Sequence, residues 1–355
     1  MLQNWFGQGQ KSEAEKDKVG LGPSRRPLIG LALGGGAARG FAHIGILRAL
    51  LERGIAPDVV VGTSIGAAVA GAYVTGHLDA FEEWARSLQP RSVLGYLDIQ
   101  LNGSGLIGGG KLATELEQSI GKRLIEDLPV KFAAIATEVA TGHEIWLTHG
   151  RLVEAIRASY ALPGIFSPVM IGDRWLVDGA LVNPVPVSAA RALGAEIVIA
   201  VNLNADNFGH GGTISAFGTP PDLADEQAPP PPPPKGIGKF FSAERAMKRE
   251  FFGRPGISTV MVEAFNIMQD RITRARLAGD PPDVLISPRV QKIGWFDFHR
   301  AEESIAHGRR AAERTIESIE EAISILAPGY IALPSPTPQK SVEAKPDDTA
   351  EDAAG

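Results

Sequence analysis

The chain has 355 residues, 44% of them hydrophobic, and contains no cysteine. The lack of cysteine excludes disulfides, catalytic thiolates and cysteine-ligated zinc sites. The formal net charge of −6 argues against nucleic acid as the main partner, because binding to a phosphate backbone favours a basic face.

Residues 1–26 are polar, charged and without hydrophobic periodicity, so we expect a flexible N-terminal segment. This segment lacks the apolar run of a secretory signal. No stretch of about 18 or more apolar residues is free of charged or polar side chains, so the sequence predicts no membrane-spanning helix. We therefore expect a cytoplasmic protein, and peripheral contact at the inner face of the membrane stays an open alternative.

Residues 27–204 read as the core of an α/β domain. The apolar run at 27–33 predicts a buried strand, and the apolar spacing after it predicts a helix that ends at Gly54. Residues 58–62 predict a second strand, followed by a helix rich in small residues. Because strands and helices alternate at this spacing, the strands should be parallel. The later predicted elements are two strands around Thr141–Gly142, a helix before Pro163, a hairpin at Gly172–Asp173, a helix in 186–195 and a strand in 196–203.

The composition changes after this core. Residues 205–240 are rich in glycine and proline, and the run Pro229–Pro234 favours an extended spacer or a loose surface insert. Periodic structure then resumes, so residues 241–330 should supply C-terminal helices and a strand that complete the same domain. The last residues, 331–355, read as a disordered tail.

The sequence Gly62-Thr63-Ser64-Ile65-Gly66 lies between the second predicted strand and a helix. This Gly-x-Ser-x-Gly pattern places a serine on a sharp turn, where its hydroxyl can act as a nucleophile and the helix N-terminus favours negative charge. Gly62 and Gly66 are needed because a Cβ atom would clash in so tight a turn. The alternative is an ordinary turn in which Ser64 only caps the helix.

A glycine-rich loop ends the first predicted strand, where Gly34, Gly35 and Gly36 precede a helix. Consecutive glycines expose backbone N–H groups to an anion, so this loop is a candidate oxyanion hole on the same sheet edge as the serine. The alternative is a dinucleotide-binding Gly-x-Gly-x-x-Gly loop. The spacing argues against that alternative, because Ala37 and Arg39 stand where the pattern needs glycine.

A serine nucleophile needs a group that accepts its proton. None of the seven histidines lies in a tight loop at a strand end, and His43 reads as a structural residue that could also point toward the glycine loop. Asp178 does lie at a strand end, before Gly179 and within an almost uncharged segment. Burial there would raise the pKa of its carboxyl and make it a stronger base. The alternative is an ordinary turn aspartate.

Together these residues resemble the patatin-like phospholipase family. The loop "GGGAARG", the elbow "GTSIG" and the later "DGA" match three of its motifs in order, and the match extends over roughly residues 28–204. The resemblance implies a three-layer α/β/α fold with a mainly parallel central sheet. It also implies a catalytic dyad of Ser64 and Asp178 without histidine, and neither a cofactor nor a metal.

By this resemblance, the protein hydrolyses carboxylic esters of lipids: Asp178 takes the proton of Ser64, and amides of the glycine loop hold the oxyanion. Ala37 replaces a glycine that many members carry, but it still offers its N–H. Arg39 would contact a lipid phosphate or stabilise the loop. Two alternatives stay open. The first is a patatin-fold protein that binds lipids or has a regulatory role and turns over little substrate. The second is a conventional Ser-His-Asp esterase.

Residues 92–110 combine glycine with apolar side chains and carry little charge. We expect this irregular stretch, with Leu106 and Ile107, or else the N-terminal "MLQNWF", to touch a lipid surface. The alternative is that regular packing buries these side chains.

Overall fold

The computed structural model describes residues 25–90, 105–107, 114, 117, 121–205 and 257–327. The segments expected at 1–26, 205–240 and 331–355 lie almost wholly outside these residues. The described elements, in chain order, are β1 (Ile29–Leu33), η1 (Ala37–Phe41), α1 (Ala42–Glu52), β2 (Val59–Thr63), α2 (Ile65–Val74), α3 (Leu78–Ser87), β3 (Gly105–Ile107), η2 (Ile125–Asp127), β4 (Lys131–Glu138), β5 (Glu144–Leu147), α6 (Leu152–Tyr160), β6 (Gly164–Phe166), β7 (Val169–Ile171), β8 (Arg174–Asp178), η3 (Gly179–Leu181), α7 (Val187–Ala192), β9 (Ile197–Val201), α9 (Ile257–Gly279), β10 (Val284–Ile286), η6 (Phe298–Arg300) and α10 (Ala301–Leu326).

The central sheet has eight strands in the order β10-β9-β1-β2-β4-β8-β7, and β5 also pairs with β4. The strands from β10 to β4 are parallel to one another, as the alternation of strands and helices predicts. On the other side of the sheet the pairs are antiparallel: β5 and β8 both pair with β4, and β7 pairs with β8. Short turns at Gly142 and Gly172 join β4 to β5 and β7 to β8. The sheet is therefore mixed, with one parallel and one antiparallel side.

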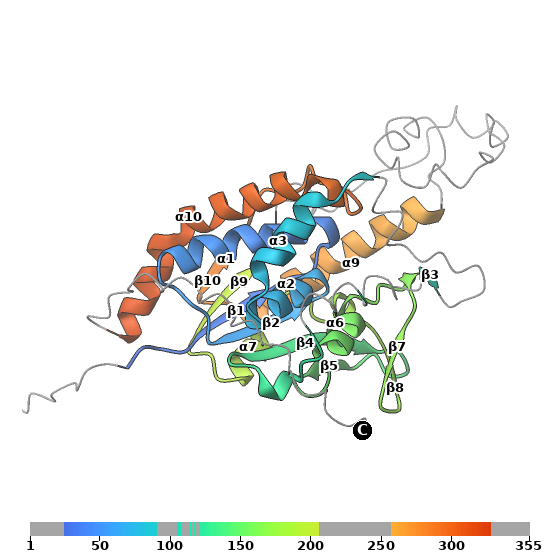
Figure 1. Cartoon of the computed structure of the whole chain (residues 1–355), viewed down its shortest axis with the longest axis horizontal. Coiled ribbons are helices and arrows are strands. Elements are labelled where there is room, and N and C mark those ends of the chain that lie inside the picture. Colours follow the sequence, from blue (N-terminus) through green and yellow to red (C-terminus); the bar gives the residue numbers. More distant parts are fainter. Residues whose placement is uncertain are drawn as a thin grey trace, which may run out of the picture.

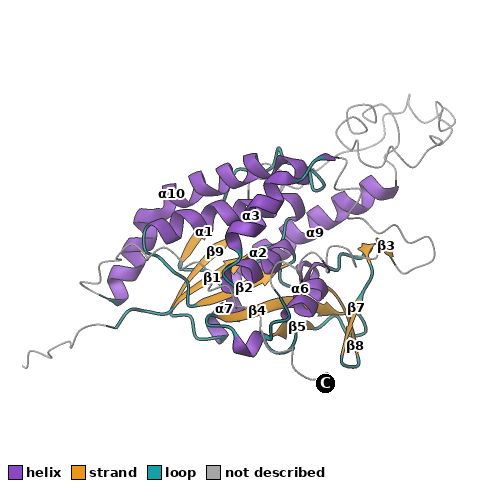
Figure 2. Cartoon of the chain, viewed as in Figure 1, coloured by secondary structure: helices purple, strands orange, loops and turns teal. Residues whose placement is uncertain are grey.

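Helices cover both faces of this sheet (Figure 2). The larger buried cluster joins one face to α1, α2, α3, α6 and α10, and the smaller cluster joins the other face to α7. In β2, Val60 points into the larger cluster, whereas Val59 and Val61 point into the smaller one, as the alternation of side chains along a strand requires. The result is a three-layer α/β/α arrangement (Figure 1).

Two glycines let α1 and α10 lie against each other. A Cβ atom on Gly308 would overlap the carbonyl group of Ala42, and a Cβ atom on Gly45 would overlap that of Ile305. One turn before Gly308 in α10, Ser304 Oγ donates a hydrogen bond of 2.9 Å to the carbonyl of Arg39. The C-terminal helix is thereby fastened to the segment that follows the glycine loop.

The stretch 92–110 differs in part from the irregular structure expected for it. Gly105–Ile107 form β3, which pairs in parallel with β6, and the rest of the stretch lies outside the described residues. Leu106 and Ile107 are therefore strand residues rather than part of an irregular loop. The pairing brings this distant segment beside the chain that follows α6.

Candidate active site

Ser64 lies on the turn between β2 and α2, at the carboxyl edge of the parallel strands. Its φ of 56° and ψ of −124° place a non-glycine residue in a sparsely populated region, as a sharp nucleophile turn requires. A Cβ atom on Gly62 would overlap the backbone of Ala67, and one on Gly66 would overlap the carbonyl of Leu33. Both glycines therefore allow the backbones to approach closely around Ser64.

The hydroxyl of Ser64 donates a hydrogen bond of 2.6 Å to Oδ2 of Asp178. The other carboxylate oxygen, Oδ1, accepts the N–H of Ala180 at 2.8 Å. Asp178 is only 2% exposed, and its burial raises the pKa of the carboxyl from 3.8 to about 6, partly offset by these two hydrogen bonds. The arrangement joins the hydroxyl of Ser64 to a carboxylate that is ionised at neutral pH and could accept its proton.

The sheet register explains how two residues 114 positions apart meet. β4 lies between β2 and β8: Thr63 pairs with Ile135, and the next β4 residue, Ala136, pairs with Asp178. Thr137 then fixes the end of β8 by donating its hydroxyl to the Asp178 carbonyl at 2.9 Å. The contact between Ser64 and Asp178 thus depends on an antiparallel pairing, of β4 with β8, beside a parallel one, of β2 with β4.

The end of α6 contacts the backbone of both dyad residues, a feature that the sequence does not reveal. Oγ of the fully buried Ser159 accepts the N–H of Ser64 at 2.9 Å. The carbonyl of Ala161 accepts the N–H of Asp178 at 3.0 Å. The only signal in the sequence is the segment "ASYALPG" itself, because nothing in its composition distinguishes a buried serine from an ordinary helix residue.

The amides of the glycine loop are not equivalent. The Gly34 N–H donates to the Val201 carbonyl at 3.2 Å, and the Gly35 N–H donates to the Pro184 carbonyl at 3.0 Å. The amides of Gly36 and Ala37 donate to no acceptor within the described part of the chain. Ala37 has a φ of 50°, a left-handed conformation that costs a non-glycine residue about 1 kcal/mol.

Arg39 lies in the interior rather than at a surface that a lipid phosphate could reach. Its side chain is 8% exposed, and Nε donates to the carbonyl of Ile293 at 2.9 Å. A weaker contact of 3.5 Å joins Nη1 to Oδ1 of Asn204. Of the two expected roles, these contacts favour stabilisation of the loop.

His43 is fully buried and donates a ring N–H to the carbonyl of Gly34 at 2.8 Å. Burial lowers the pKa of His43 to about 4, so the ring is neutral at physiological pH and serves to hold the loop. Within the described part of the chain, no hydrogen bond at Ser64 or Asp178 comes from a histidine. His210, one of the seven, lies outside the described residues.

No group of three or more acidic or histidine side chains among the described residues could hold a metal ion.

Comparison with known proteins shows the family to which the chain belongs. The model of the patatin-like phospholipase family matches residues 31–191. An uncharacterized NTE family protein of Mycobacterium tuberculosis is 32% identical over 337 residues, covering 84% of this chain and 93% of that protein. A patatin-like phospholipase domain-containing protein of Caenorhabditis elegans is 35% identical, covering 55% of this chain and 16% of that protein. A Neurospora crassa protein named lysophospholipase is 31% identical, with coverage of 56% and 15%. The chain therefore belongs to the patatin-like phospholipase family.

Proposed function

We propose that this protein is a serine hydrolase of lipid acyl esters, with Ser64 as the nucleophile and Asp178 as the base. The observation that carries the proposal is the 2.6 Å hydrogen bond from the Ser64 hydroxyl to the buried carboxylate of Asp178. Membership of the family supports a lipid as the source of the ester. The proposal covers the esters of phospholipids and of lysophospholipids alike.

Acylation begins when Asp178 Oδ2 accepts the Ser64 proton and Oγ attacks the ester carbonyl carbon. The C–O bond to the leaving alcohol then breaks, and the alcohol takes the proton from Asp178. In deacylation a water molecule gives one proton to Asp178 and attacks the acyl-enzyme, and the fatty acid leaves as Ser64 recovers its proton. The raised pKa of Asp178, about 6, suits both directions of transfer near neutral pH.

The oxyanion of each tetrahedral intermediate needs preorganised N–H donors. The Gly36 and Ala37 amides are the donors we assign, because those of Gly34 and Gly35 are already bonded to backbone carbonyls. Gly34 and Gly35 instead fix the loop against the ends of neighbouring segments. We therefore assign the binding of the oxyanion to the amides of Gly36 and Ala37 alone.

Access to lipid is proposed to be peripheral. No helix within the described ranges is both long and apolar enough to cross a bilayer. Three apolar side chains form a row across the antiparallel side of the sheet: Met170 pairs with Trp175, and the Val139 N–H donates to the Trp175 carbonyl. Met170 is 50% exposed, Trp175 is 51% exposed and Val139 is 56% exposed. Half-exposed apolar and aromatic side chains of this kind suit contact with a lipid interface.

The experiment that tests the proposed function compares ester hydrolysis by the wild type and Ser64→Ala, with Ser87→Ala on α3 as a matched control. Losing the nucleophile should lower kcat/KM for a short p-nitrophenyl ester by about 10³-fold or more, by analogy with other serine hydrolases. The control should retain the wild-type rate. A folded Ser64→Ala protein with near wild-type turnover would overturn the proposal.

A further inference from the structure

The segment 180–184, which follows Asp178 closely in the chain, contacts each part of the candidate active site. The Ala180 N–H donates to Oδ1 of Asp178 at 2.8 Å. The Asn183 carbonyl accepts the hydroxyl of Thr63, the residue before the nucleophile, at 2.8 Å. The last carbonyl of the segment accepts an N–H of the glycine loop at 3.0 Å. The position of the 180–184 segment therefore affects the base, the nucleophile turn and the glycine loop together.

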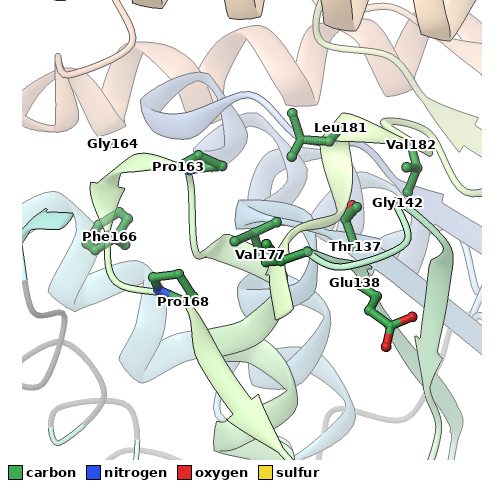
Figure 3. Close-up of a pocket in the computed structure, with 11 residues that line it drawn as sticks. Thr137, Glu138, Gly142, Pro163, Gly164, Phe166, Pro168, Val177, Leu181 and Val182 are labelled. Carbon is green, nitrogen blue, oxygen red and sulfur yellow. The ribbon is translucent and has the colours of Figure 1, made fainter. Parts of the chain in front are cut away.

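Packing supports only part of the 180–184 segment. Leu181 and Val182 are half-buried and line a cavity of about 480 Å³. Figure 3 shows Pro163 and Phe166 on the other side of this cavity. A segment with few packing contacts on one side opens locally at low cost in free energy. Hydrogen bonds from other elements therefore matter more for holding this segment in one position.

Glu144 on β5 and Arg276 on α9 supply such hydrogen bonds. The carboxylate of Glu144 accepts the side-chain N–H of Asn183 at 2.7 Å through Oε1, and accepts Nη2 of Arg276 through Oε2. Nε of Arg276 donates to the Val182 carbonyl at 3.1 Å. The ion pair thus holds two successive residues of the 180–184 segment. The Glu144 side chain is 16% exposed and that of Arg276 is 36% exposed, so water screens the pair only in part.

We propose that Glu144 and Arg276 position the reacting groups, by holding the 180–184 segment and through it Asp178 and the turn at Ser64. This inference rests on the proposed function, because the geometry that the pair maintains is that of the dyad. Among the described residues, neither side chain hydrogen-bonds to Ser64 or Asp178, so both are positioning rather than catalytic residues. A misplacement of about 1 Å between reacting groups can lower a rate by about 10²-fold.

Removal of the guanidinium tests this role. Arg276→Met keeps an apolar stem at a partly exposed site and should fold. Its kcat for a short p-nitrophenyl ester should fall by about ten-fold or more at unchanged KM, because the loss is in positioning and not in substrate binding. Arg276→Lys should recover part of the lost kcat, since the ammonium keeps the charge beside Glu144 without the second donor to Val182. Arg274→Met is the matched control on the same helix: Arg274 pairs with Asp270 within α9, so kcat should stay unchanged.

A double-mutant cycle on kcat shows whether the two residues act as a unit. Glu144→Gln places an uncharged amide beside the guanidinium and should lower kcat by about the same factor as Arg276→Met. The double variant should lose no more than either single variant, because the second substitution removes a contact that the first has already broken. Losses that multiply would show two independent effects and would overturn the pair.

The reactivity of Ser64 supplies a readout that a loss of stability alone would not move. In Arg276→Met that circular dichroism shows to be folded, the rate of covalent labelling by a fluorophosphonate ester should fall by about the same factor as kcat. A folded Arg276→Met protein with wild-type kcat and labelling, or with a higher KM at unchanged kcat, would overturn the positioning role. Ester hydrolysis that survives in Ser64→Ala would instead overturn the proposed function.

Discussion

Asp178 is buried from water, yet it must be ionised before it can take the proton of Ser64. Its pKa of about 6 predicts that kcat/KM for a short ester rises with pH through a single ionisation near pH 6 and is level above pH 7. A pH–rate profile from pH 4.5 to 8.5 measures this midpoint. A midpoint near 4, or a rate that falls across this range, would contradict the assignment of Asp178 as the base.

The same burial makes the ionised carboxylate of Asp178 a cost to stability. Because the pKa is 3.8 for the free group and about 6 in the fold, this group's contribution to stability is full below about pH 4 and is lost as pH rises through about 6. At 1.36 kcal/mol per pKa unit, the loss is at most about 3 kcal/mol.

Asp178→Asn should therefore abolish hydrolysis and yet stabilise the protein. The amide can still accept the Ala180 N–H and can donate to Ser64, while it carries no charge to desolvate. Urea unfolding at pH 8 should show a gain of about 1–3 kcal/mol over the wild type, and the gain should disappear near pH 4. A variant less stable than the wild type at pH 8 would show that burial does not raise this pKa.

Ser159 is a positioning residue, because it acts on the backbone of Ser64. Ser159→Ala leaves the Ser64 N–H without its 2.9 Å acceptor, which should cost about 1–3 kcal/mol in unfolding free energy. We expect kcat for a short ester to fall by about ten-fold or more while KM stays the same, since the substrate does not touch Ser159. Steady-state kinetics separates the two parameters. A rise in KM at unchanged kcat would place Ser159 in substrate binding instead.

Among the elements, α10 packs against α1 and holds the segment that follows the glycine loop. Gly308 packs against the backbone of Ala42, so Gly308→Ala must push α10 away from α1. Overpacking of this kind typically costs about 1–3 kcal/mol, and it should also disturb the bond from Ser304 to the Arg39 carbonyl. Thermal unfolding should show a lower Tm for Gly308→Ala. Gly279→Ala, at a site with no atom within 4 Å of the added Cβ, is the control and should leave Tm unchanged.

The predicted elements agree with the structure where hydrophobic periodicity is strong. The strands at 27–33 and 58–62 and the hairpin at Gly172 are confirmed within a few residues, and residues 241–330 supply helices and a strand as expected. The order of the strands in the sheet cannot be predicted from periodicity, because strand pairing depends on contacts between distant segments rather than on local pattern. No local signal places β8 beside β4, and so none could predict the 2.6 Å distance between Ser64 and Asp178.

The same limit applies within the candidate site. Residue types are enough to propose Ser64, Asp178 and the glycine loop as candidate site residues, because their motifs are local in the chain. Which amides of the loop donate to the backbone depends on the carbonyls of Val201 and Pro184, and both of these residues lie far from the loop along the chain. The role of Ser159 is equally a consequence of how α6 packs on the turn at Ser64.

At the scale of the whole molecule, β7 and β8, which carry Met170 and Trp175 of the exposed row, lie on the side of the structure away from the C-terminal end of α10 (Figure 1). Met170→Ser with Trp175→Ser should lower co-sedimentation with phosphatidylcholine vesicles by about ten-fold or more, since each half-exposed side chain contributes about 1 kcal/mol on transfer. The matched control is Ile325→Ser with Leu326→Ser. It removes two side chains at the C-terminal end of α10 that are 71% and 53% exposed.

The control pair should bind vesicles as the wild type does. Equal binding by both double variants would exclude the row as the docking surface and leave the stretch 92–110 or the N-terminus as the alternatives.

Covalent capture of the nucleophile tests the central claim most directly. A fluorophosphonate ester reacts with an activated serine and leaves an adduct that intact-mass spectrometry detects and peptide mapping locates. We predict one adduct per chain, on Ser64, no adduct on Ser64→Ala, and a rate of labelling that falls by about 10²-fold or more in Asp178→Asn, because the base no longer accepts the proton. Labelling at another residue, or equally fast labelling of Asp178→Asn, would contradict a hydrolase built on the Ser64–Asp178 dyad.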